Sequence, residues 1–75
     1  MPLSFASIGK PMIIKEIKGK SDIYQRLRTM GFIEGQKIMV IEQSHGNLIV
    51  ALQQCRVAIN EAIALKIIVR EELCN

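Results

Sequence analysis

Short apolar segments separated by glycine and polar residues run through this sequence, and two of them are apolar at every position. A strand at 38–41 or at 48–52 would therefore carry apolar side chains on both of its faces. A flat sheet of such strands would leave an apolar face in water, whereas a sheet that curls into a small barrel encloses it. The pattern predicts a mainly β fold with a small barrel.

Five short strands are expected. The first covers 12–18, and the three-residue step between its β-branched residues Ile14 and Ile17 breaks strict alternation, which predicts a bulge. A hairpin connection is expected at 44–47, because His45-Gly46-Asn47 separates two apolar segments. The other four strands are expected at 38–41, 48–52, 56–59 and 67–70.

One α-helix is expected between the first two strands, near 22–30. Its apolar residues recur at the i, i+4 and i+7 spacing of a single helix face. Ser21 or Asp22 can cap its start, and Gly31 can end it in a left-handed conformation. A short helical turn capped by Asn60 is expected before the last strand.

A chain of 75 residues supplies one hydrophobic core, so we expect a single domain over 1–75. Apolar residues make up 49% of the sequence, and a domain this small leaves part of that apolar surface exposed to meet another protein. No apolar run approaches the roughly 20 residues that cross a bilayer, so we expect no membrane insertion. The first residues lack the charged start and apolar block of a secretion signal, which favours a cytoplasmic location.

The positive charge lies in the first half of the chain. Residues 1–37 contain seven Lys or Arg and three acids, a balance of +4, whereas residues 38–75 contain three and four, a balance of −1. Such a surface can attract an acidic protein or a nucleic acid, although scattered charge is usually a solvated face. Single-strand binders stack bases on aromatic side chains, and none of Phe5, Tyr24 and Phe32 lies on an expected strand. We therefore expect no nucleic-acid binding.

The segment 26–35 resembles a signature of the FeoA family, Leu-x-x-Met/Leu-Gly-Phe/Met-x-x-Gly. The likeness continues before the segment, at Gly9 and 14–19, and after it, at 56–59 and 64–69. It implies an SH3-like five-stranded barrel that assists FeoB, a membrane GTPase transporter of bacterial ferrous iron. Similar modules occur in some iron-dependent repressors. The signature residues of this chain are Leu27, Met30, Gly31, Phe32 and Gly35.

The end of the expected helix and the turn after it form the predicted partner-binding surface. Gly31 and Gly35 fix the turn, and large apolar residues are bunched there within a charged rim, which is how protein-binding patches are commonly built. The core can also bury some of these apolar side chains, Leu27 above all. The predicted surface residues are Arg26, Arg28, Met30, Phe32, Ile33 and Glu34.

The sequence predicts no metal site, no cofactor and no catalysis. His45, Cys55 and Cys74 lack the paired spacing of zinc ligands. The chain has no evident pairing of a nucleophile with a base and no glycine-rich phosphate loop, and Glu71-Glu72 is a carboxylate pair only in sequence. We therefore expect a binding module and not an enzyme.

Three alternatives remain open to the sequence alone. One is a small basic barrel that binds nucleic acid. Another is an SH3-like module of the kind found in transcription regulators. The third is a homo-oligomer whose surplus apolar surface meets copies of itself, which is compatible with binding a transporter.

Overall fold

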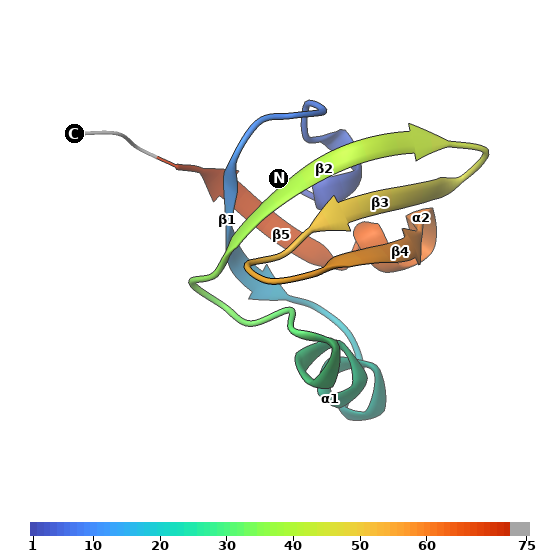
Figure 1. Cartoon of the computed structure of the whole chain (residues 1–75). Helices are drawn as coiled ribbons and strands as arrows, with labels where there is room; N and C mark the ends of the chain where they lie inside the picture. Colours follow the sequence, from blue (N-terminus) through green and yellow to red (C-terminus); the bar gives the residue numbers. More distant parts are fainter. Residues whose placement is uncertain (73–75) are drawn as a thin grey trace.

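The computed structural model describes residues 1–72, which contain a five-stranded antiparallel sheet (Figure 1). The order of strands in the sheet is β4-β3-β2-β1-β5, so β1 lies between β2 and the last strand of the chain. This architecture confirms the predicted mainly β fold. The strands are β1 (Met12–Ile17), β2 (Lys37–Ser44), β3 (Asn47–Ala51), β4 (Arg56–Asn60) and β5 (Ile67–Glu71).

Two bulges bend the sheet. The first lies in β1, where the register with β5 shifts between Ile14 and Glu16, as the sequence predicts. The second was not expected and lies in β2, where the register with β3 shifts between Val40 and Glu42. A bulge increases the local twist of its strand, so these two shifts curl the sheet around its apolar inner face.

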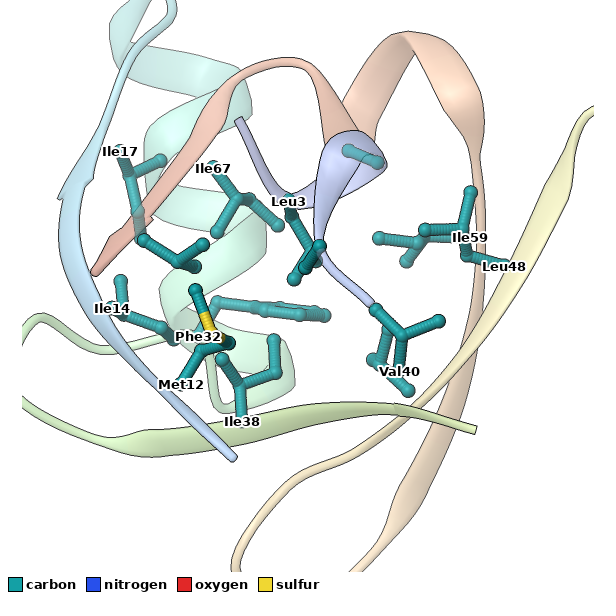
Figure 2. Packing of buried hydrophobic residues seen from close by; sticks show 14 of the residues in the cluster. Leu3, Met12, Ile14, Ile17, Phe32, Ile38, Val40, Leu48, Ile59 and Ile67 are labelled. Atoms are coloured by element: carbon teal, nitrogen blue, oxygen red, sulfur yellow. The ribbon is translucent and has the colours of Figure 1, made fainter. Parts of the chain in front are cut away.

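The inner face of the sheet and Phe32, which follows Gly31 at the end of the first α-helix, belong to one core (Figure 2). Residues two apart on the strands are buried together, for example Ile38 with Val40 and Leu48 with Val50. Phe32 is fully buried, and Figure 2 shows its ring in the middle of the labelled core residues. The other largest fully buried side chains are Leu3, Met12, Ile14, Ile67 and Val69.

The outer face of the sheet is apolar as well. Ile13, Met39, Ile41 and Ile49 alternate with core residues along β1, β2 and β3, and each is half-buried. The expectation of apolar side chains on both faces is therefore confirmed. This outer face matters for the candidate site, which adjoins it.

The two α-helices differ in whether a side chain caps their first turn. In α1 (Ser21–Met30) the prediction of a Ser21 or Asp22 cap is wrong: Lys20 takes the cap position and provides no side-chain hydrogen bond. The helix begins early enough to place both predicted residues inside its first turn. In α2 (Glu61–Ala64) the predicted cap is confirmed, because Asn60 Oδ1 accepts a hydrogen bond of 2.8 Å from the Ile63 N–H.

The first residues of the chain also pack into the fold, which the sequence did not reveal. A short 3-10 helix, η1 (Leu3–Phe5), follows a bridge between Pro2 and Ile68. The Met1 amino group donates to the Val69 carbonyl at 2.8 Å, and the Val69 N–H donates to the Met1 carbonyl at 2.7 Å. These contacts cover the outer edge of β5.

Candidate partner-binding surface

The end of α1 is a left-handed glycine cap. Gly31 has a φ of 108°, which a residue with a Cβ rarely adopts. Its N–H donates to the Arg28 carbonyl at 3.0 Å, and the Phe32 N–H reaches back to the Leu27 carbonyl at 3.0 Å. This is the Schellman pattern, and it turns the chain so that Phe32 enters the core beside the last turn of the helix.

The turn that follows is tied to the sheet. The Gln36 N–H donates to the Ile33 carbonyl at 3.0 Å across Gly35, whose φ of 91° belongs to the third position of a type II turn. The Gly35 N–H then donates to the Ile14 carbonyl at 2.8 Å, and the Ile14 N–H donates to the Gln36 carbonyl at 2.9 Å. Backbone hydrogen bonds therefore hold this turn against β1.

Five of the six predicted surface residues are accessible. Met30 and Ile33 are half-buried, and both sit on the backbone that the cap and the turn fix. Phe32 is not part of the surface, because its side chain is 0% exposed and fills the core. The helix-end surface therefore consists of Arg26, Arg28, Met30, Ile33 and Glu34.

Three polar side chains cross this surface and join the helix to the turn. The Tyr24 hydroxyl donates to Glu34 Oε2 at 2.8 Å, and Arg28 donates to Glu34 Oε1 at 2.9 Å. The Arg28 guanidinium also lies 5.7 Å from the centre of the Tyr24 ring, within cation–π range. Tyr24 was missing from the predicted site. Tyr24 and Arg28 are four residues apart on the helix, and this spacing predicts that their side chains contact each other. It does not predict their contacts with Glu34.

Hydrogen bonds lower the pKa of Glu34. The largest cause is a hydrogen bond from its own backbone N–H, the next is the Tyr24 hydroxyl, and the Arg28 charge adds a smaller effect. Together they outweigh the opposing effect of desolvation, which raises the pKa. Glu34 is therefore ionised at neutral pH, and the rim of the surface carries one satisfied ion pair. Arg26 makes no ion pair within residues 1–72.

A hollow of about 560 Å³ on the outer face of the sheet begins beside this turn. Pro11, Ile13, Met39 and Leu52 supply apolar walls, and Gly35 from the turn forms part of the lining. The hollow also approaches the helix cap, since a Cβ added to Gly31 would lie 3.2 Å from Leu52 Cδ1. This hollow was not predicted from the sequence, because its walls come from three separate segments of the chain.

Two of the three possible metal donors, His45 and Cys55, are described by the structure, and they lie in different turns. His45 lies in the hairpin turn between β2 and β3, and Cys55 lies in the turn between β3 and β4; both are exposed. Cys74 lies outside the described residues. Residues 1–72 contain no group of three or more His, Cys, Asp or Glu side chains that could hold a metal ion.

The carboxylates of Glu71 and Glu72 point to different partners. Glu71 pairs with Lys10 at 2.7 Å, and Glu72 pairs with Lys37 at 3.0 Å. The Lys10 contact lowers the pKa of Glu71. Each of the two carboxylates therefore forms its own surface ion pair, and neither pair was predicted from the sequence.

Among residues 1–72, none of the helices has the length and apolar character needed to cross a bilayer.

Comparison with known proteins gives matches over nearly the whole chain. A family model described as the FeoA domain matches residues 1–71. Fe(2+) transport protein A of Methanocaldococcus jannaschii is 36% identical over 70 residues, which cover 93% of this chain and 85% of that protein. This relative and the family model confirm the resemblance found in the sequence.

Solved structures give the same result for the fold. The crystal structure of an iron uptake regulatory protein, FeoA, superposes with a TM-score of 0.86 at 31% identity, covering 93% of this chain and 95% of that one. FeoA of Stenotrophomonas maltophilia, crystallised with zinc and described as a prokaryotic SH3 domain protein, gives a TM-score of 0.80 at 21% identity. That match covers 93% of this chain and 89% of the other. The SH3-like fold is confirmed.

Proposed function

This chain belongs to the FeoA family, and from that premise we propose that it assists ferrous-iron uptake by binding the cytoplasmic part of a FeoB-type membrane GTPase transporter. In this role the chain is a cytoplasmic binding module and not an enzyme. Its contact with the transporter is the helix-end surface.

One observation carries the proposal: two large apolar side chains are held partly exposed on a backbone that cannot easily rearrange. Met30 precedes the glycine cap and Ile33 opens the type II turn, and both flank Phe32, which is fixed in the core. Pre-ordered apolar anchors lose little conformational entropy when a partner arrives. They are therefore suited to be the energetic centre of an interface.

The hollow extends this surface across the sheet. Its apolar walls and its place beside Gly35 suit a side chain of the partner that inserts while the backbone rests on the turn. Arg26, Arg28 and Glu34 are exposed, and each lies within four residues of Met30 or Ile33 in the sequence, so they are suited to form the polar rim.

The aromatic residues do not favour the nucleic-acid alternative. Phe32 is buried, and the Tyr24 hydroxyl is committed to Glu34. Phe5 is highly exposed, at 69%, but it lies on η1 and not on the sheet. A single isolated ring is a poor platform for stacking successive bases.

The test measures association and folding together. Met30→Asp and Ile33→Asp each bury a charge in the complex, and we expect them to weaken binding to the cytoplasmic part of the transporter by several kcal/mol, with loss of iron uptake. Ile68→Asp is the matched control, since Ile68 is a half-buried apolar residue on β5. Thermal melts must show that all three variants fold.

Normal association by folded Met30→Asp and Ile33→Asp variants would place the contact on another face. Loss of association in the Ile68 control as well would show that any new surface charge disrupts the complex, and that the helix-end surface has no special role.

A further inference from the structure

Within residues 1–72, the two edge strands of the sheet differ in whether another segment covers their outer side. The outer edge of β5 is covered by the first residues of the chain, through the bridge of Pro2 to Ile68 and the paired hydrogen bonds of Met1 with Val69. The strand at the other end of the order is β4, and within residues 1–72 no strand pairs with its outer side (Figure 1). An open edge is a template for another strand.

β4 has few of the features that usually protect an edge, since its one charged residue is Arg56, at the first position of the strand. Its sequence, Arg56–Asn60, contains no proline and no lysine. Its register with β3 runs without a bulge from Arg56 to Asn60, unlike the registers of β1 with β5 and β2 with β3. Arg56 and Ala58 are exposed. The strand therefore presents a regular and accessible edge.

The hydrogen bonds of the β3–β4 turn show which backbone groups face outward. The Leu52 N–H donates to the Cys55 carbonyl at 2.8 Å, so Cys55 faces β3. Successive residues of a strand alternate in direction, which places Val57 and Ile59 toward β3 as well. The N–H and C=O groups of Arg56 and Ala58, and the N–H of Asn60, therefore point away from the sheet.

We propose that this edge pairs with β4 of a second copy of the chain, antiparallel and about a two-fold axis at Ala58. In this register the two Ala58 residues exchange hydrogen bonds, and each Asn60 N–H donates to the Arg56 carbonyl of the other copy. Val57 of one copy lies opposite Ile59 of the other. The result is a continuous sheet through both copies.

The charges of the segment support a second copy as the occupant. In this register Arg56 of one chain lies near Glu61 of the other, and the symmetry repeats that pair. Neither residue makes an ion pair within residues 1–72. No like charges face each other along the strand, and the small Ala58 side chains at the centre allow close approach. The edge is thus complementary to itself.

Self-association is measured with the full chain by sedimentation equilibrium over a range of concentrations. We expect a weak dimer that Ala58→Lys weakens by at least about tenfold, because a lysine at an edge opposes pairing. Gln43→Lys is the matched control: it adds the same charge at an exposed position of β2, away from the edge, and leaves the dimer unchanged. A thermal melt confirms that both variants fold.

A charge swap tests the register. Arg56→Glu places like charges together and is expected to weaken the dimer by about tenfold, and adding Glu61→Arg is expected to restore it. Amide exchange gives an independent readout: protection of Ala58 and Asn60 rises with protein concentration, whereas Val57 is already bonded to β3. Failure of the double variant to recover would show that this register is wrong.

Two further results would overturn the proposal. One is a native chain that stays monomeric to about 1 mM, a concentration at which even weak interfaces associate. The other is Ala58 protection that appears only with the transporter fragment, which would assign the edge to a strand of that partner. The proposal is independent of the helix-end surface, so Met30→Asp is expected to leave the dimer intact, and Ala58→Lys to leave transporter binding intact.

Discussion

The Tyr24 hydroxyl and Glu34 Oε2 are 2.8 Å apart, although the end of α1 and the glycine cap separate the two residues in the chain. This hydrogen bond links the first half of the helix to the turn beyond it. Arg28 contacts both side chains, so the outside of the turn is held by side chains while its inside is held by backbone hydrogen bonds to β1.

Replacing Tyr24 with Phe is expected to raise the pKa of Glu34 toward its ordinary value, because the hydroxyl donates to the ionised carboxylate. Carbon-detected NMR titration of the carboxyl group measures this shift. Glu71 is the internal control, since Lys10 lowers its pKa and Tyr24 is not among the causes. A Glu34 titration identical to that of the native chain would show that the hydrogen bond is absent in solution.

Acid is expected to loosen the helix-end surface. A carboxyl group whose pKa is lower in the folded chain than in the unfolded chain stabilises the fold above its unfolded pKa. That contribution is lost as the pH falls through the folded pKa. The protection of the Gly35 amide, which is its intrinsic exchange rate at each pH divided by its observed rate, should therefore fall below the ordinary pKa of Glu34, more in the native chain than in Glu34→Gln. Equal pH dependence in the two chains would contradict this.

Phe32→Ala is expected to cost about 3–5 kcal/mol of unfolding free energy, because it empties the centre of a small core. Such a loss is comparable with the whole unfolding free energy of a small domain. Phe32→Leu, which is expected to cost less, is therefore the variant to measure in urea. Ile33→Ala should cost far less than Phe32→Ala, since Ile33 is half-exposed. Equal losses at the two positions would contradict the burial of Phe32.

The two turn glycines are expected to differ in their tolerance of alanine. Gly35→Ala should cost about 1–2 kcal/mol, entirely from backbone strain at a φ of 91°, because a Cβ there meets nothing within 4 Å. Gly31→Ala should cost more, since its Cβ would also lie 3.2 Å from Leu52 Cδ1. Urea denaturation of both variants gives the order, and the reverse order would contradict it.

The helix starts provide a matched pair of substitutions. Asn60→Ala removes the hydrogen bond to the Ile63 N–H and is expected to cost about 1 kcal/mol. Ser21→Ala should be close to neutral, because Ser21 lies inside the first turn of α1 and does not cap it. Thermal melts of the two variants test this, and a larger loss at Ser21 would show that it caps the helix in solution.

Most of the fold could be predicted from signals between residues that are close together in the sequence. Gly31 followed by Phe32 specifies the end of α1, because only a glycine readily takes the left-handed position and the next residue then packs on the helix. The step from Ile14 to Ile17 likewise locates the β1 bulge. Each feature depends on residues within one or two turns of each other.

The features that were wrongly predicted or missed depend on contacts between residues that are far apart in the sequence. Leu3 carries no periodic pattern, and only its packing against distant strands shows that it is core. Ser21 and Asp22 are both good caps by residue type, but Gly19 and Lys20 set where α1 begins. Phe32 lies between the glycine cap and the type II turn, where neither helical nor strand periodicity distinguishes a buried side chain from an exposed one.

The place of β1 in the sheet has a consequence for how the chain is made. Met12 pairs with Ile38 on one side and with Glu71 on the other. The strand β1 is made early, but it cannot pair on its second side until β5 has been synthesised. Until residues 67–71 leave the ribosome, the apolar side chains of β1 lack half of their neighbours. Such non-local pairing slows folding and exposes apolar surface meanwhile. The sheet is therefore completed only once β5 has been made, so its closure is a late step of folding.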